Sequence, residues 1–269
     1  MKHLWLNADD FGLTPAVTRG ICDAMVDGVV ATSTAMVCRS DAAASVREYA
    51  PRVPGRIGLH LQLTDGTPRS DPARVPSLLG RGGRFPRKRR LMQAVDAAEV
   101  RLEWDAQLAA LRSMGVEPSH VDSHHHVHGV PGVFEVYVAF ARDHGLPARG
   151  GSPRHLRLLR EAGVATTDAF TPGFWKDTVG VQGLIDVAVD AARHVPEDGC
   201  IEMMSHPGRI DDALRERSHY VEDRERELAV LCSGELHERL LALGILLSRR
   251  PVFTSQPPSR ETGHERDDR

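Results

Sequence analysis

The chain alternates between short apolar segments and amphipathic helical patterns, and this alternation restricts its fold to a few classes. Apolar or alternating runs at residues 4–6, 30–37 and 56–63 predict strands. Helical spacing follows the first of them, with Thr14 as the N-cap and Pro15 at the first helical position. Strands that alternate with helices predict a mainly parallel sheet of about six or seven strands, connected by helical crossovers.

The rest of the chain continues this pattern, with one long interruption. Further strands are expected at 119–124, 200–206 and 245–252, and further helices at 41–49, 88–113, 131–145, 181–194, 220–231 and 234–243. A Gly-, Pro- and Arg-rich segment, 64–87, predicts a long loop of the kind that often has a function. We therefore expect one domain over residues 1–255 and a disordered tail over 256–269.

Composition and charge disfavour several classes of partner. The formal net charge of -3 and the pI near 6.5 provide no electrostatic attraction for nucleic acid or for a membrane surface. The N-terminus lacks the apolar segment of a signal peptide, and no run approaches the roughly 18 apolar residues of a membrane span. The cysteines form no CxxC pair and are expected to be reduced thiols. A cytoplasmic protein is therefore expected, either a monomer or a homo-oligomer.

Polar side chains gather where several of the predicted strands end. The first strand runs into "NADD", a later one into "SHVDSHHH" and another into "EMMSHP", while the strand "GLHLQL" contains His60. In parallel α/β folds, functional residues lie at the carboxyl ends of the strands. These motifs are therefore expected to meet at one edge of the sheet and to form a site there.

The adjacent carboxylates of Asp9 and Asp10 are the first candidates. In a regular strand their side chains point to opposite faces, so both reach one site only if the chain turns, and Gly12 permits a turn. Two such carboxylates then suit two tasks, one as a metal ligand and one as a general base. A helix cap or a solvated turn is the alternative interpretation.

Five histidines crowd into "HVDSHHHVH", residues 120–128. Strand periodicity puts His120, Asp122 and His124 on one face, where Asp122 can orient a histidine by accepting its ring N–H. A surface cluster is the alternative for this stretch, and His120 by itself fits a buried position.

Two further histidines lie in or beside predicted strands. His60 is either a ligand or a hydrogen-bonded core residue, and His206 is either catalytic or part of a turn. One Asp and two His would supply three protein ligands and leave a position open for water, as a hydrolytic metal site requires. This ligand set suits Zn²⁺ or another late divalent ion. The spare carboxylate and histidine would serve as base and acid in attack on a carbonyl and loss of an amine.

Taken in order, "NADDFG", "GLHLQLT", "HVDSHHHVH" and "EMMSHPG" resemble the motifs of the YdjC-like carbohydrate deacetylases, the family that includes chitooligosaccharide deacetylase. "YVEDRERELAVLCS" is similar to the same family's pattern of Tyr, Arg and Glu-Leu before a terminal helix. The likeness covers residues 2–250. It implies an α/β fold, a single-domain irregular (β/α) barrel of the polysaccharide-deacetylase type. It also implies metal-dependent removal of N-acetyl groups from amino sugars or short oligosaccharides.

The resemblance also implies roles for single residues. Asp10, His60 and His124 match the family's metal ligands, Asp9 matches the catalytic base, and His206 matches the proton donor to the leaving amine. One divalent ion is implied, and the family's usual ion is Mg²⁺, which otherwise prefers oxygen ligands.

Substrate contacts follow less directly from the motifs. The further candidates for contact with a small N-acetylated sugar, or for support of the site, are Asp122, His126, His128, Arg149 and Trp175. Arg149 fits contact with substrate, pairing with an active-site carboxylate, or a plain surface position, and Trp175 fits a sugar-stacking platform or an apolar anchor for its loop. Gln62 stands where the family often has Asn, and this departure is expected to alter nearby contacts or substrate fit.

Other functions remain open at this stage. A metal-dependent amidase or phosphoesterase on a similar barrel would need ligands for a second metal, for which His126 and His128 are available. A non-catalytic sugar-binding relative would have no use for a base such as Asp9 beside a ligand such as Asp10. A nucleic-acid enzyme is disfavoured by the acidic balance.

Overall fold

The computed structural model describes residues 1–89, 95–250 and 253. In this part of the chain the strands are β1 (Lys2–Phe11), β2 (Thr32–Ala35), β3 (Ile57–Leu61), β4 (Val121–Ser123), β5 (Ala169–Thr171), β6 (Cys200–Ser205) and β7 (Ile245–Leu247). The predicted tail, 256–269, and the end of the last predicted strand, 251–252, lie outside the described residues.

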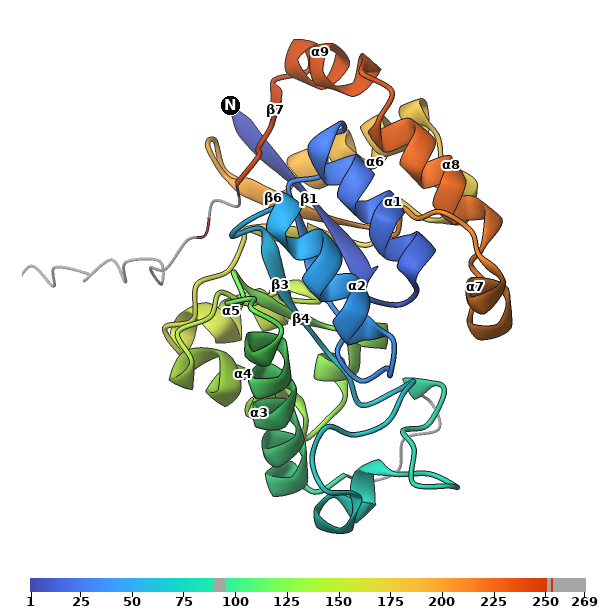
Figure 1. Cartoon of the computed structure of the whole chain (residues 1–269). Coiled ribbons are helices and arrows are strands. Elements are labelled where there is room, and N and C mark those ends of the chain that lie inside the picture. The colour runs from blue at the N-terminus through green and yellow to red at the C-terminus, as the bar shows by residue number, and fades with distance from the viewer. Residues whose placement is uncertain (90–94, 251–252, 254–269) are drawn as a thin grey trace, which may run out of the picture.

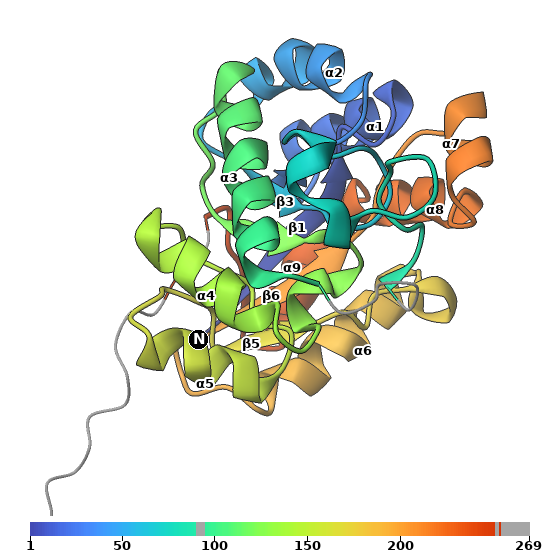
Figure 2. The same cartoon turned by 90° about the horizontal axis from the view of Figure 1, so that it is seen from below.

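The strands form one parallel sheet that curves into a half-barrel (Figures 1 and 2). Their order is β4-β3-β2-β1-β6-β5, and β7 pairs with the beginning of β1. Among the described residues beyond β4, the wall continues as an isolated bridge from Val121 to Ala148 and a hydrogen bond from Ala148 N to Ala165 O, 2.9 Å long. The predicted α/β fold with an irregular barrel is thus confirmed, and its irregularity lies at this open side.

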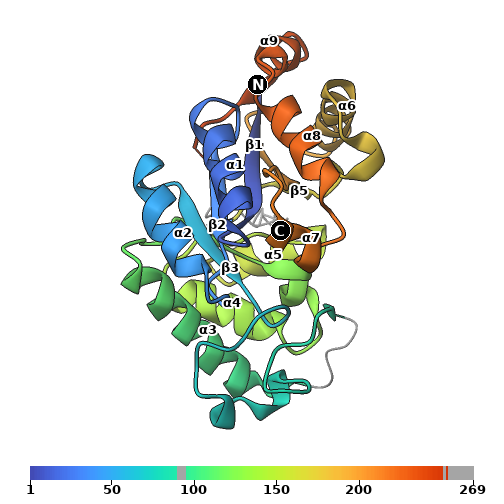
Figure 3. The ribbon, with the colours of Figure 1, turned by 45° about the vertical axis from the view of Figure 1, so that its right-hand side comes forward.

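The helices are α1 (Pro15–Val26), α2 (Ala42–Tyr49), α3 (Ala97–Ser113), α4 (Phe134–Asp143), α5 (Pro153–Glu161), α6 (Val181–Ala192), α7 (Asp212–Arg217), α8 (Glu222–Leu231) and α9 (Glu235–Ala242). Seen along the barrel, α1 to α6 and α8 surround the strands (Figure 2). Helices α1 and α8 pack together beside β1 (Figure 3). Among the described helices, none has the length and apolar character needed to span a bilayer.

Local capping determines where the predicted helices begin. Thr14 caps α1 as expected, because its side chain accepts a hydrogen bond from the N–H of Val17. The helix predicted at 88–113 is shorter in the structure, because α3 begins at Ala97. Asp96 caps it by accepting hydrogen bonds from the N–H groups of Ala98 and Glu99. Five residues of that prediction, 90–94, lie outside the described part of the chain.

Three short elements were not predicted. Helix α5 begins at a Ser152 cap directly after two glycines, in a stretch that reads as irregular. Strand β5 has only three half-buried residues, and α7 has only six residues, so neither carries a measurable periodicity. The predicted loop at 64–87 contains two short 3₁₀ turns, η2 (Pro72–Arg74) and η3 (Pro76–Leu78).

Strand register brings the carboxyl ends of the central strands level. Leu61 of β3 lies opposite Ser123 of β4, and Ala8 of β1 lies opposite Ser205 of β6. The polar residues that follow these positions therefore emerge at one edge of the sheet, as the sequence predicts, while the N-terminus and β7 lie at the other end (Figure 1).

Candidate metal centre and active site

The end of β1 bends so that both of its carboxylates serve one site. Asp10 has φ of 74°, in the left-handed region, and the pairing of β1 with β2 shifts register between Ala8 and Phe11. An oxygen of Asp9 and an oxygen of Asp10 each lie within 4.8 Å of a His60 nitrogen. The expected turn is therefore present: Gly12 has φ of 90°, and the N–H of Leu13 donates a 3.0 Å hydrogen bond to the carbonyl of Asp10. The left-handed conformation already begins at Asp10, where a non-glycine residue costs about 1–3 kcal/mol.

Asp10, His60 and His124 converge as a potential metal-binding group. Their ligand atoms lie within 4.8 Å of one another. Asp10 Oδ1 is 3.0 Å from His124 Nδ1 and 3.5 Å from His60 Nε2. Among the described residues this buried oxygen accepts no hydrogen bond. A cation placed between the three side chains would give that oxygen a partner, so the group fits a metal ion.

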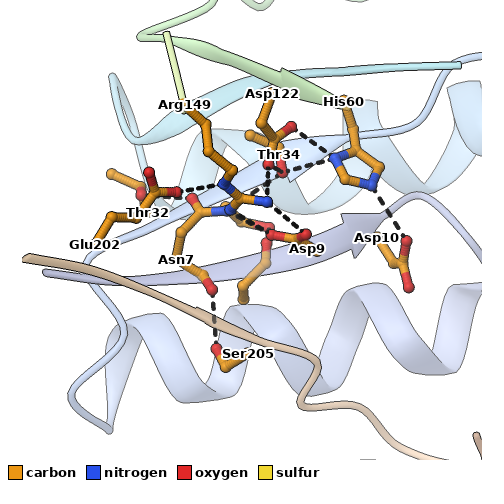
Figure 4. Close-up of polar contacts among 12 residues, drawn as sticks. Asn7, Asp9, Asp10, Thr32, Thr34, His60, Asp122, Arg149, Glu202 and Ser205 are labelled. Atoms are coloured by element: carbon orange, nitrogen blue, oxygen red, sulfur yellow. Dashed lines mark hydrogen bonds and ion pairs between the residues drawn. The ribbon is translucent and has the colours of Figure 1, made fainter. Parts of the chain in front are cut away.

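His60 is held in one orientation by Asp122, from the neighbouring strand. Its Nδ1 lies 2.6 Å from Asp122 Oδ1, which leaves Nε2 directed at Asp10 (Figure 4). Thr34 donates a 3.0 Å hydrogen bond to the other oxygen of Asp122. Burial opposes a charged imidazole, but the carboxylates of Asp122 and Asp10 raise the pKa of His60 to about 10. The predicted orienting carboxylate is thus Asp122, and the histidine that it orients is His60.

Arg149 sits at the centre of a buried cluster of carboxylates (Figure 4). It donates 2.8 Å hydrogen bonds to both oxygens of Asp9, reaches Asp122 at 2.8 Å and binds Glu202 at 2.6 Å. Burial raises the pKa of Asp9, but Arg149 outweighs it and holds that pKa well below its ordinary value. Burial raises the pKa of Glu202 to about 7. Arg149 therefore pairs with an active-site carboxylate and does not occupy a surface position.

Asp10 is also bound by a residue from the far end of the chain. Arg224 Nη2 of α8 donates a 2.6 Å hydrogen bond to Asp10 Oδ2, the oxygen that faces away from the histidines. Burial raises the pKa of Asp10, but Arg224 and His124 lower it more, so that the pKa lies well below its ordinary value. Arg224 was not among the predicted site residues, although it lies in the stretch "YVEDRERELAVLCS".

The histidine cluster turns sharply after β4. Residues His124–Gly129 form a 3₁₀ helix, η5, within which His125 and His126 have φ of 54° and 51°. The His124 and His125 rings lie against each other, with centroids 3.9 Å apart. Of this segment, only His124 joins the potential metal group.

The other members of the cluster make separate contacts. His120 is buried, as expected for it, with Nε2 3.2 Å from Asn7 Oδ1. His128 is fully buried; its ring stacks on Tyr137, and its Nδ1 lies 2.6 Å from Ser123 Oγ. His128 therefore supports the turn from inside the fold and has no exposed surface to offer to a substrate. His126 is partly exposed and packs edge-on against Phe170. Of His126 and His128, only His126 can therefore contact a substrate.

His206 and Trp175 lie together on the other side of the site. Their rings meet edge to face with centroids 4.9 Å apart, and Trp175 also stacks on Tyr220 at 3.7 Å. Burial lowers the pKa of His206 to about 4, although Asp10 and Asp9 act in the opposite direction. One face of the Trp175 indole is therefore covered by Tyr220.

Gln62 turns away from this chemistry. Its side chain accepts a 3.0 Å hydrogen bond from the N–H of Cys38 and donates a 2.7 Å bond to the carbonyl of Asp65. It therefore fixes two loop backbones to each other. The long loop that follows touches the histidine segment, since Thr64 Oγ1 lies 3.0 Å from His125 Nδ1. The expected effect of Gln62 is thus on loop position, with no contact to the potential metal ligands.

The chain is similar to known carbohydrate deacetylases over nearly its whole length. The chain is 33% identical to a carbohydrate deacetylase of Thermoanaerobacter pseudethanolicus over 94% of this chain and 100% of the relative. It is 36% identical to a carbohydrate deacetylase of Enterococcus faecalis V583, over 92% of this chain and 96% of the relative. A crystal structure from Enterococcus faecalis V583, described as a cellobiose-phosphate cleavage protein, superposes with a TM-score of 0.83 at 35% identity, covering 92% of this chain and 97% of the other.

The sequence pattern of the family described as YdjC-like protein matches residues 3–242. That span holds every residue placed at the site above, from Asp9 at the end of β1 to Arg224 in α8. The chain therefore belongs to the YdjC-like protein family.

Proposed function

We propose that this protein is a metal-dependent hydrolase that removes N-acetyl groups from amino sugars or short oligosaccharides. The observation that carries the proposal is the convergence of Asp10, His60 and His124 around an unpartnered carboxylate oxygen, with Asp9 alongside. A metal group next to a separate ionised carboxylate is one arrangement that hydrolyses an unactivated amide. The naming of the relatives as carbohydrate deacetylases supports the substrate class.

We assign one exchangeable divalent ion to Asp10, His60 and His124. Two imidazoles and a carboxylate favour Zn²⁺ or another late divalent ion, and the resemblance to the family favours Mg²⁺. A divalent ion held there would act as a Lewis acid toward water and toward the acetyl carbonyl. His60 is already oriented for this task, because Asp122 occupies its Nδ1.

Asp9 is the proposed general base. Its low pKa keeps it ionised at every working pH, so that it is always ready to accept a proton from the attacking water. A carboxylate with a low pKa is a weak base. It would therefore need a neighbouring divalent ion that makes the attacking water more acidic. Arg149 and Asn7, which donate to the same carboxylate, fix its orientation.

His206 is the proposed proton donor to the departing amine. Its imidazole is partly exposed and neutral at rest, because desolvation lowers its pKa to about 4. The proton that the attacking water loses, once it is on His206, would therefore be released readily to the more basic nitrogen of the leaving group. Trp175, beside His206, is placed to pack against a sugar ring with the part of its indole that Tyr220 leaves uncovered.

The rival phosphoesterase has less support. Asp9, His60 and Asp122 form the other potential metal group among the described residues. However, Arg149 already binds both carboxylates of that group, and its positive charge repels a cation there.

We also propose that the enzyme works in the cytoplasm. No disulfide joins the cysteines of the described residues, and free thiols are usual in that reducing compartment.

The function is tested by measuring acetate release from a panel of N-acetylated mono- and oligosaccharides. We expect release from at least one short N-acetylated sugar, loss of that release on treatment with a chelator, and recovery on adding a divalent metal. Release of phosphate from phosphorylated sugars without any release of acetate would replace this proposal with the rival one.

A further inference from the structure

Helix α8 carries a buried carboxyl group that the proposed mechanism does not use. Glu227 has no exposed surface, and it makes no salt bridge with any described residue. One of its oxygens accepts a hydrogen bond from the Tyr220 hydroxyl, and the other accepts one from the backbone N–H of His206. Burying a carboxyl group without a cationic partner costs free energy, and these two hydrogen bonds offset part of that cost.

The two partners of Glu227 belong to the wall of the active site. His206 follows β6, and Tyr220 precedes α8, so the carboxyl group links the end of β6 to the start of α8. Tyr220 in turn supports the Trp175 indole, whose plane lies 7° from that of the Tyr220 ring. The Tyr220 hydroxyl also accepts a 3.5 Å hydrogen bond from the N–H of Lys176. One carboxyl group thus contacts His206 directly and the Trp175 loop through Tyr220.

The Trp175 loop depends on support of this kind. Lys176 has φ of 52°, a left-handed conformation that is unfavourable for a side chain of its type. The adjacent Trp175 begins the short turn η6 (Lys176–Thr178), in which the Trp175 N–H donates a 2.8 Å hydrogen bond to Thr178 Oγ1. A strained turn persists only where its surroundings hold it, and the stacked Tyr220 ring is one neighbour that does so.

We propose that Glu227 is a positioning residue that holds the His206 imidazole and the Trp175 indole in one fixed arrangement, without itself touching substrate. The proposal deepens the proposed deacetylase function and rests on it for its catalytic consequence. The geometric part does not need the reaction, because it concerns the order of Trp175 and His206 in the protein before substrate binds.

Two substitutions at Glu227 separate hydrogen bonding from bulk. Glu227→Leu fills a similar volume but leaves the His206 N–H and the Tyr220 hydroxyl without their acceptor. Glu227→Gln keeps an oxygen for the His206 N–H, and its amide N–H₂ faces a hydroxyl that can accept as well as donate. Burial raises the pKa of Glu227 to about 8, so the neutral amide also matches the charge of the wild-type group near neutral pH.

Chain composition makes the geometric part directly measurable by acrylamide quenching of tryptophan fluorescence. The protein has three tryptophans, of which Trp5 and Trp104 are 1% and 0% exposed, so that quenching reports on Trp175. In the metal-loaded protein we expect steeper quenching for Glu227→Leu than for wild type, and wild-type quenching for Glu227→Gln.

The matched control is Glu103→Leu, compared with Glu227→Leu in a Trp104→Phe background because Trp104 follows Glu103 and its exposure would add to the quenching. Glu103 is equally buried and also accepts backbone N–H groups, those of Arg69 and Ser70, but it lies in α3 away from Trp175. We expect this variant to lose thermal stability and to keep the quenching of the Trp104→Phe background. If Glu103→Leu increased quenching as much as Glu227→Leu, the effect would be a general loosening of the fold and the proposal would be wrong.

The catalytic part is tested on the same variants with a substrate found by the acetate assay. Because a displaced acid costs about 10²-fold in rate, Glu227→Leu should lower kcat by about that factor, with a small change in KM, and Glu227→Gln should restore most of the loss. Unchanged kcat and unchanged quenching in Glu227→Leu would overturn the proposal. If that variant does not fold, Tyr220→Phe, which removes only one hydroxyl, must raise Trp175 quenching or the proposal fails. If wild type deacetylates nothing, the proposed function fails, while quenching still decides the positioning role.

Discussion

Arg149 binds Asp9 through two parallel hydrogen bonds, from Nη1 to Oδ2 and from Nη2 to Oδ1, each 2.8 Å long. The same guanidinium binds Asp122, which orients His60, and Glu202 on β6. A single cation from beyond β4 therefore pairs with three carboxyl groups near the potential metal group. The proposed base and the orientation of a proposed ligand both depend on it.

Replacing Arg149 should disrupt stability and activity together. Arg149→Met removes the charge and leaves buried carboxylates unpaired, so the free energy of unfolding should fall by about 3–5 kcal/mol. Arg149→Lys keeps the charge but cannot bind both Asp9 oxygens at once, so it should lose less stability while kcat still falls. Denaturant unfolding and kcat of the two variants check this. A Met variant as stable as wild type would show that the cluster does not depend on Arg149.

Asp9→Asn should separate catalysis from metal binding. The side chain keeps its shape but cannot accept a proton, so kcat should fall by about 10²- to 10⁴-fold. Metal affinity, measured by calorimetry, should stay close to wild type because Asp10 and not Asp9 is the proposed ligand. Near-wild-type kcat with the metal still bound would remove Asp9 from the role of base.

His124 and His126 form a matched pair for the assignment of the ligands. His124→Ala should abolish metal binding, since its Nδ1 faces the unpartnered oxygen of Asp10 at 3.0 Å. His126→Ala should leave metal binding unchanged, because His126 packs against Phe170 outside the potential metal group. Elemental analysis after dialysis distinguishes the two. The reverse result would move the ligand to His126.

Acid should destabilise this protein already above the pH range in which its exposed carboxylates titrate. Burial lowers the pKa of His120 to about 4 and holds that of His128 well below its ordinary value. In the unfolded chain each has a pKa of about 6.5, so between pH 6.5 and 4 the unfolded state binds more protons and stability falls as the pH falls. Each unit of difference in pKa corresponds to about 1.4 kcal/mol.

Unfolding free energies measured between pH 7 and 4 check this expectation. His128→Asn should flatten the dependence, because it removes one group whose proton uptake favours unfolding. Glu202 and Glu227, whose pKa burial raises to about 7 and about 8, take up protons in the folded state and oppose this trend, so the comparison with the variant is decisive. The same pH dependence in His128→Asn and wild type would mean that His128 is not held neutral by burial.

The sequence predicts the site best where function and strand ends coincide. Asp10, His60 and His124 lie in motifs within or directly after predicted strands, and parallel topology alone brings such motifs to one edge. The bend that turns both carboxylates inward was also expected, but only the structure shows that it already begins at Asp10.

Residues whose role depends on long-range packing were not predictable in this way. Arg224 and Glu227 lie in "VEDRERE", which by charge alone reads as a solvated helix face. They are buried because α8 packs beside α1 with that side turned toward β1, and no local pattern contains this information. Arg149 was singled out, but its choice among three carboxylates follows from tertiary contacts alone.

The most direct test of the whole account is to titrate chelator-stripped protein with a divalent metal while measuring acetate release from an N-acetylated sugar. Because the structure brings together one group with an unpartnered ligand oxygen, we predict that release starts near zero and reaches its maximum at one equivalent of metal per chain. Release by the stripped protein at the full rate, or a maximum reached only at two equivalents, would contradict a single metal centre on Asp10, His60 and His124.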